Sequence, residues 1–132
     1  MKVILATAAV HPFHGHGGVE KYPYYLGKYL LKEGIEVKIV SSTDYQGGRR
    51  TEFYNGLQYD LIPPMVYLRK ITGPWSIMYN YSLNKYLHKS SFDILHSFST
   101  TAYAYLHFKE KPVIVQPFGL ELFTAPSITN AN

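Results

Sequence analysis

The sequence of 132 residues is long enough for one domain with a single hydrophobic core, residues 1–132, and short for two. It contains no cysteine, which excludes disulfides and thiolate metal sites, and no apolar run of the about 18 residues that a membrane span needs. The formal charge of +4 permits contact with anionic lipid without requiring it, and we expect no nucleic-acid partner. Because the sequence shows no secretory signal, we expect a cytoplasmic protein.

Tyrosine is frequent, at thirteen residues, whereas charged residues make up only 17% of the chain, against roughly 25% in typical soluble domains. A tyrosine ring offers apolar area with a polar hydroxyl, which suits stacking against a sugar or a wet interface. The same property suits core packing and partner contact, and composition leaves these interpretations open.

The apolar run of residues 2–10 shows no alternation, which predicts a strand covered on both faces in a parallel sheet. A glycine-rich loop, residues 11–18, follows. Gly17 and Gly18 let the backbone approach a ligand, and the free N–H groups at the start of the next helix favour an anion, so the loop can hold a phosphate. The spacing is not the dinucleotide fingerprint, and an ordinary strand-to-helix turn stays open as the alternative.

Three histidines lie in the same loop, namely His11, His14 and His16. With no cysteine in the chain and no acid in the loop, we expect no metal site there. We expect instead that His14 or His16 touches a phosphate or an acceptor.

The next segment, residues 19–33, predicts a helix, and Gly34 suits its C-terminal end. Apolar residues recur there at spacings of three and four and form one stripe along the helix: Val19, Tyr22, Tyr25, Leu26, Tyr29 and Leu30. Residues 35–40 predict a second strand, which a right-handed crossover makes parallel to the first.

Residues 52–62 predict a β-hairpin, because the pair Asn55 and Gly56 readily adopts the positive φ angles of a type I′ turn. Pro63 and Pro64 then end the strand.

The segment of residues 65–89 mixes aromatic and apolar residues with four cations and contains no acid; the cations are Arg69, Lys70, Lys85 and Lys89. Such a mixture can lie in a membrane interface. The alternative is a helix over about residues 75–89 that packs on the core and leaves its lysines in solvent.

Two further strands are predicted at residues 92–97 and 113–115, with a short helix between them at residues 101–109. In an open parallel sheet the strand ends present the groups that face a ligand, which points to Ser97 and Gln116.

Three stretches resemble the retaining, nucleotide-sugar-dependent glycosyltransferases of family 4, which have the two-domain GT-B fold. Residues 15–40 look like the Gly-Gly loop, amphipathic helix and second strand that open the N-terminal domain of that family. Residues 92–99, F-D-I-L-H-S-F-S, are similar to its "D-hydrophobic-hydrophobic-H" strand end. Residues 111–121 are similar to its next strand and to the H-G-x-E/D turn after it.

The resemblance implies roles for particular residues. Gly17 and Gly18 would lie beside the donor diphosphate. The acceptor side would be formed by His96, Ser97, Gly119 and Glu121. Where the family often carries histidine, this chain has Phe98 and Phe118, and phenylalanine can neither donate a hydrogen bond nor shuttle a proton.

The resemblance also implies that the complete enzyme needs a C-terminal transferase domain or a partner subunit. That part would bind a nucleotide-diphosphate sugar as donor, for transfer to a sugar or lipid-linked acceptor without a metal. We expect residues 1–132 to be the acceptor-side half, inactive alone, with no cofactor of its own and with residues 122–132 as a tail or linker.

We therefore predict an α/β fold, a Rossmann-like and mainly parallel sheet with helices on both faces in a single domain. The predicted function is acceptor binding within a glycosyltransferase, on the inner membrane face if residues 65–89 contact lipid. A non-catalytic docking subunit of a two-component transferase and a stand-alone phosphate or nucleotide-binding module are the alternatives.

Overall fold

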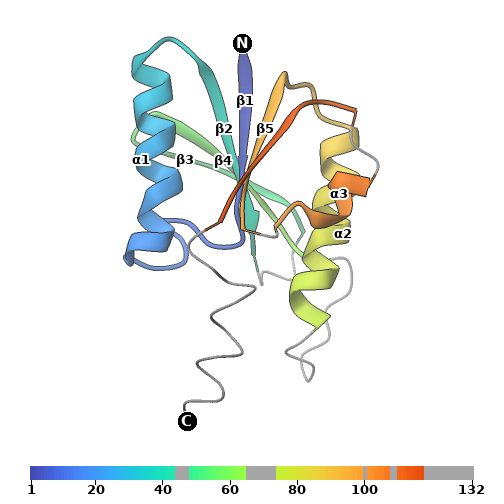
Figure 1. Cartoon of the computed structure of the whole chain (residues 1–132). Coiled ribbons are helices and arrows are strands. Elements are labelled where there is room, and N and C mark those ends of the chain that lie inside the picture. The colour runs from blue at the N-terminus through green and yellow to red at the C-terminus, as the bar shows by residue number, and fades with distance from the viewer. Residues whose placement is uncertain (44–47, 65–73, 100, 108–109, 118–132) are drawn as a thin grey trace, which may run out of the picture.

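The computed structural model describes residues 1–43, 48–64, 74–99, 101–107 and 110–117. These residues form a sheet in the order β3-β4-β2-β1-β5-β6 (Figure 1). The strands are β1 (Lys2–Ala6), β2 (Glu36–Ser42), β3 (Arg50–Tyr54), β4 (Leu57–Ile62), β5 (Ile94–Phe98) and β6 (Val113–Gln116). All neighbouring strands run parallel except β3 and β4, so the predicted mainly parallel sheet is confirmed.

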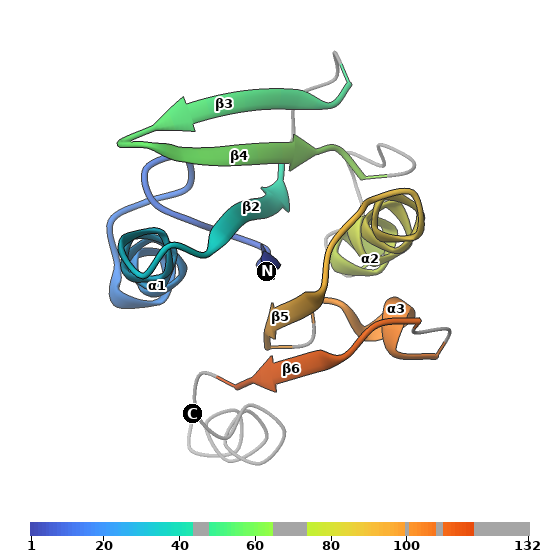
Figure 2. The same cartoon turned by 90° about the horizontal axis from the view of Figure 1, so that it is seen from above.

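Helices cover both faces of the sheet, as predicted. Helix α1 (Gly18–Lys32) lies on one face, and α2 (Pro74–His88) and the short α3 (Tyr103–His107) lie on the other (Figure 2). The chain passes from β1 through α1 to β2 on one side, and from β5 through α3 to β6 on the other. This is the doubly wound arrangement of a Rossmann-like domain.

Local sequence explains where these elements stop. Gly34 has φ +81° after α1, and the amide of Ile35 donates to the carbonyl of Leu30, which ends the helix. In the hairpin, Asn55 and Gly56 have φ of 49° and 83°, as the predicted type I′ turn requires. The hairpin is not an appendage of the sheet, because β4 pairs in parallel with β2 and leaves β3 at the edge.

Each face of the sheet carries its own apolar cluster. Ile4, Leu83 and Leu95 belong to the cluster beneath α2 and α3, whereas Leu5, Ile39 and Leu57 belong to the cluster beneath α1. Residues on β1 therefore alternate between two buried clusters, which explains why its sequence shows no polar alternation.

Helix α1 turns only one edge of its predicted apolar stripe to the core. The sheet-facing side carries Pro23, Tyr24 and Gly27, all buried. The predicted stripe is divided. Leu26 and Leu30 are half-buried and pack against the core, whereas the tyrosines lie on the outer side, with exposed fractions of 45% for Tyr22, 62% for Tyr25 and 60% for Tyr29. The reason is packing distance: a Cβ added to Gly27 would lie 3.1 Å from Leu57 and 3.3 Å from Ile39, so even a methyl group there would require these buried side chains to shift.

Helix α2 bears out the core-packing alternative for the described part of residues 65–89. Tyr79, Leu83, Tyr86 and Leu87 are buried against the sheet, and Lys85 and Lys89 are exposed. Arg69 and Lys70 lie outside the described residues.

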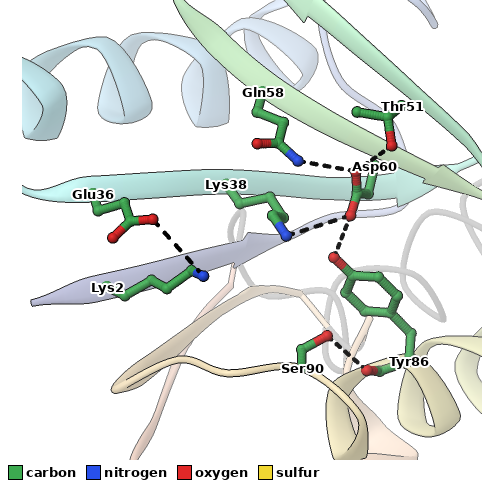
Figure 3. Close-up of polar contacts among 8 residues, drawn as sticks. All are labelled: Lys2, Glu36, Lys38, Thr51, Gln58, Asp60, Tyr86 and Ser90. Carbon is green, nitrogen blue, oxygen red and sulfur yellow. Dashed lines mark hydrogen bonds and ion pairs between the residues drawn. The ribbon is translucent and has the colours of Figure 1, made fainter.

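A buried carboxylate joins α2 to three strands. The side chain of Asp60 on β4 accepts hydrogen bonds from Thr51 on β3 (2.9 Å) and from Tyr86 on α2, and pairs with Lys38 on β2 at 3.6 Å (Figure 3). Burial by itself raises the pKa of Asp60, but the bonds from Tyr86 and Thr51 and the charge of Lys38 outweigh it and hold the pKa below its ordinary value. Asp60 is therefore ionised inside the protein at neutral pH.

Candidate functional site

The two halves of the sheet diverge at β1 and β5, whose chains leave toward opposite faces. A cavity of about 320 Å³ opens at this point, at the carboxyl ends of both strands. It is lined by Thr7, Ala8, Ala9, Val19, Phe98, Ser99 and Thr101. Open parallel sheets bind ligands at such a switch point, so we take this cavity as the candidate site.

A larger cavity, of about 590 Å³, lies elsewhere, along the outer side of α1 between Gly18 and Tyr29. No strand end lines this larger cavity, because all of its lining residues belong to α1. We therefore choose the candidate site by its position at the strand ends and not by its volume.

The loop between β1 and α1 is held firmly from both sides of the sheet. From α2, the hydroxyl of Tyr79 donates to the carbonyl of Thr7 at 3.2 Å. From β4, the hydroxyl of Tyr59 donates to the carbonyl of His11 at 3.1 Å. Burial raises the pKa of both phenols well above the ordinary value, so both stay protonated and keep donating. Sequence analysis missed these two supports, because burial of a tyrosine depends on the fold.

Gly17 and Gly18 stand where the loop enters α1, beside the cavity. Gly17 is the N-cap, with no side chain to occupy the first N–H groups, and Gly18 begins the helix. A Cβ added to Gly18 would meet no atom within 4 Å, so the space over its backbone is open. A Cβ on Gly17 would lie 2.6 Å from Oε2 of Glu20, so the carboxylate of Glu20 lies over Gly17. An incoming phosphate therefore has direct access at Gly18 and has to displace Glu20 at Gly17.

The three histidines of the loop have different surroundings. His14 binds the backbone with both ring nitrogens: Nδ1 accepts from the amide of Val10 at 3.0 Å, and Nε2 lies 2.7 Å from the carbonyl of Ser42. His11 and His16 pair through their Nδ1 atoms at 3.0 Å. His14 thus ties the loop to the end of β2. The side chains of His14 and His16 are both exposed, and the prediction of a ligand contact is carried forward for His16 because both ring nitrogens of His14 already contact the backbone.

Of the residues predicted for the acceptor side, His96 borders the cavity and Ser97 does not line it. His96 Nε2 lies 2.8 Å from the side-chain oxygen of Gln116, and its ring stacks on Phe98 with a centroid distance of 4.6 Å. Phe98 lines the cavity, so His96 borders the site through it. Ser97 is buried and its hydroxyl accepts from the amide of Ala102, which places it in the support of the turn before α3. Phe118, Gly119 and Glu121 lie outside the described residues.

The structure adds hydroxyl residues that sequence analysis did not select. Thr7 and Thr101 line the cavity, but their hydroxyls donate to nearby carbonyls at 3.0 and 2.7 Å. Ser99 lines it with φ +58°, a left-handed conformation that serine rarely adopts. Its place two residues after the predicted strand of residues 92–97 was the one signal that the sequence offered.

The described residues contain no group of three or more histidines and acids able to hold a metal ion. Among the helices found there, none combines the length and apolar content that crossing a bilayer requires.

A doubly wound sheet with a cavity at its switch point is the arrangement of a Rossmann-like domain. Residues 16–126 match the family described as Glycosyltransferase Family 4. This chain belongs to glycosyltransferase family 4, and its fold is that of a GT-B glycosyltransferase N-terminal domain. No curated protein matches the sequence.

Two solved structures show the likeness of fold. Sucrose-phosphate synthase from Thermosynechococcus elongatus has a TM-score of 0.67 and 14% sequence identity over 95% of this chain and 35% of that chain. The catalytic domain of starch synthase IV from Arabidopsis thaliana, bound to ADP and acarbose, has a TM-score of 0.65 and 16% identity over 88% of this chain and 33% of that chain. The chain thus spans about a third of the length of these structures.

Proposed function

We propose that this chain is the acceptor-side domain of a retaining, nucleotide-sugar-dependent glycosyltransferase and is inactive without a second domain or partner subunit. The observation that carries the proposal is the open cavity at the switch point, bounded on one side by the first turn of α1. Family membership supports sugar transfer as the chemistry.

Within this proposal, the backbone at Gly18 approaches the diphosphate of the donor, and the unpaired N–H groups of the first turn of α1 stabilise its charge. The acceptor sugar, free or lipid-linked, occupies the cavity, where Ser99 and the ring of Phe98 contact it. His96 and Glu121 would complete the acceptor side, and His16 would contact the phosphate from the loop. The second domain supplies most of the nucleotide-sugar contacts, and the protein acts in the cytoplasm.

Nuclear magnetic resonance tests the proposal on the chain itself. We would titrate the ¹⁵N-labelled protein with inorganic pyrophosphate, UDP-glucose and ADP-glucose and follow the amide signals of its glycines. We expect weak binding that shifts the signals of Gly17 and Gly18, whereas Gly34 and Gly56, which follow α1 and β3, stay in place. No transfer of sugar to water or acceptor should occur.

Two outcomes would contradict the proposal. Unchanged Gly17 and Gly18 signals at saturating pyrophosphate would show that the loop is an ordinary turn. Tight nucleotide binding by the chain alone would favour the stand-alone nucleotide-binding module.

A further inference from the structure

The outer side of α1 carries an aromatic surface that adjoins the candidate site at one end, where the ring of Tyr22 contacts Phe98 with centroids 5.8 Å apart. Tyr22, Tyr25 and Tyr29 are each exposed by 45% or more and follow one another at spacings of three and four residues, so they lie on one side of the helix. Together with Gly18, Lys21 and Leu26 they line the cavity of about 590 Å³. Large aromatic side chains gathered on one exposed face mark an interaction surface.

The charges beside this surface have one sign. Lys21, Lys28 and Lys32 recur at spacings of seven and four residues and therefore form a row next to the tyrosines. Lys28 also donates to the carbonyl of Asn55 at 2.6 Å, which leaves its charge in place at the surface. The acid of α1, Glu20, directs its carboxylate to Gly17 instead. Glu33 follows the helix at its far end.

We propose that this side of α1 docks on the surface of an anionic lipid membrane. Tyrosine is enriched at the boundary between water and lipid, where its ring meets the acyl region and its hydroxyl stays hydrated. Lysine beside it reaches the headgroups, and anionic lipid attracts it. The charge of the row and the net charge of +4 complement such a surface.

Two other occupants fit the surface less well. The interfaces of protein partners are depleted in lysine, whereas lysine is typical of helices that lie on membranes. A second copy of the chain would bring the same lysine row against itself, because a two-fold interface uses the same patch on both partners.

Docking through α1 differs from the predicted docking through residues 65–89. The described end of that segment uses its apolar residues to pack α2 on the sheet. Among the residues whose exposure is described, those aromatic residues that are both exposed and flanked by several lysines lie on α1. The N-terminal end of α1 borders the switch-point cavity, so a docked helix would place the site close to the lipid.

Sedimentation with vesicles tests the proposal. Vesicles of phosphatidylcholine with phosphatidylglycerol should bind the protein, and vesicles of phosphatidylcholine alone should bind it much less. The triple change Tyr22→Ser, Tyr25→Ser and Tyr29→Ser should abolish binding. Each of Lys21→Gln and Lys32→Gln should weaken it by about fivefold at low salt, and added salt should do the same to the wild type.

A matched control comes from the opposite side of the sheet. Tyr81 and Tyr103 are 55% and 58% exposed there, close to the 62% and 60% of Tyr25 and Tyr29, so Tyr81→Ser with Tyr103→Ser is matched to Tyr25→Ser with Tyr29→Ser and should leave binding unchanged. Circular dichroism establishes that each variant is folded. The proposal is overturned if the wild type stays in the supernatant with anionic vesicles, or if the control and the α1 variant lose binding equally. It is also overturned if the α1 change abolishes a concentration-dependent dimer but not vesicle binding.

Discussion

Asp60 stands out among the residues of the described chain because it is ionised and only 2% exposed. Removing a carboxylate from water costs several kcal/mol, and a single ion pair rarely repays that cost. Here interactions with β3, β2 and α2 together offset the cost of desolvating the carboxylate. Losing any one of these partners would leave the buried charge less stabilised, so the carboxylate couples the edge hairpin to α2.

Stability should fall in acid because of this residue. The pKa of Asp60 is lower in the folded than in the unfolded protein, so its contribution is complete above the unfolded pKa of about 4 and is lost as the pH falls through it toward the folded value. Urea unfolding between about pH 7 and about pH 3 measures the loss.

Substitution separates this effect from general acid unfolding. Asp60→Asn should lower the free energy of unfolding by about 2–4 kcal/mol at neutral pH and flatten its dependence on pH below about pH 5. Asp93→Asn is the matched control, because the carboxylate of Asp93 is exposed and accepts from the amide of Lys2. An equal flattening in both variants would contradict the role given to Asp60.

Gly18 separates folding from ligand binding at the proposed phosphate site. Because a Cβ there meets no atom within 4 Å, Gly18→Ala should leave the free energy of unfolding within about 1 kcal/mol of the wild type, or raise it. The same Cβ would stand in the space proposed for the diphosphate. We expect the pyrophosphate-induced shift of the Gly17 amide to disappear in this variant; its persistence would remove Gly18 from the site.

At the scale of the elements, α1 shows that packing distance determines which side of a helix is buried. Gly27 faces Leu57 and Ile39, both fully buried, and its missing side chain brings the helix close to the sheet. This close approach leaves three tyrosines exposed on the far side. A larger residue in place of Gly27 should therefore lower the stability of the protein, although it would have a higher helix propensity than glycine.

Gly27→Val tests this packing. The added methyl groups have no space between α1 and the sheet, and we expect a loss of about 2 kcal/mol or more in the free energy of unfolding. Gly18→Ala in the same helix serves as the control. A neutral Gly27→Val would mean that Leu57 and Ile39 can move aside, and that α1 is held by other contacts.

Sequence patterns were sufficient for the elements that local chemistry determines. Asn55 and Gly56 specify their turn, Gly34 ends its helix, and the apolar runs of β1 and β2 indicate buried parallel strands. The exposure of the α1 tyrosines was not predictable, because a periodicity counts tyrosine as apolar and does not count glycine, although Leu26 and Leu30 of the same stripe do pack against the core. Only the short distance between Gly27 and the sheet shows that the side of the helix with Gly27, and not the side with the tyrosines, packs on the sheet.

At the scale of the whole molecule, the order of the strands brings the site together. The glycine loop was recognisable from sequence, but its neighbours Ser99 and Thr101 come from the far half of the chain. Likewise, Ser97 follows the pattern of a strand-end ligand group, yet its hydroxyl supports the turn before α3. Such assignments depend on a side chain's direction, which a strand pattern leaves undetermined.

The sheet should be least stable at its edges. β1 is buried along most of its length, whereas β3 and β6 consist largely of exposed or half-buried residues. Amide hydrogen exchange followed by mass spectrometry should show the slowest exchange in β1 and β2 and faster exchange in β3 and β6. Stronger protection in β3 than in β1 would contradict this order.

The pairing of β1 with β5 also has a consequence for how the chain acquires its site. The amide of Lys2 bonds to Asp93, 91 residues further along, and the strands that frame the cavity meet only through such distant contacts. Closing so long a loop is entropically unfavourable, and contacts of this range slow folding. During synthesis the N-terminal half, with its glycine loop and helix, leaves the ribosome well before β5. The candidate cavity therefore cannot form before β5 has been added, which makes it a late feature of the nascent chain.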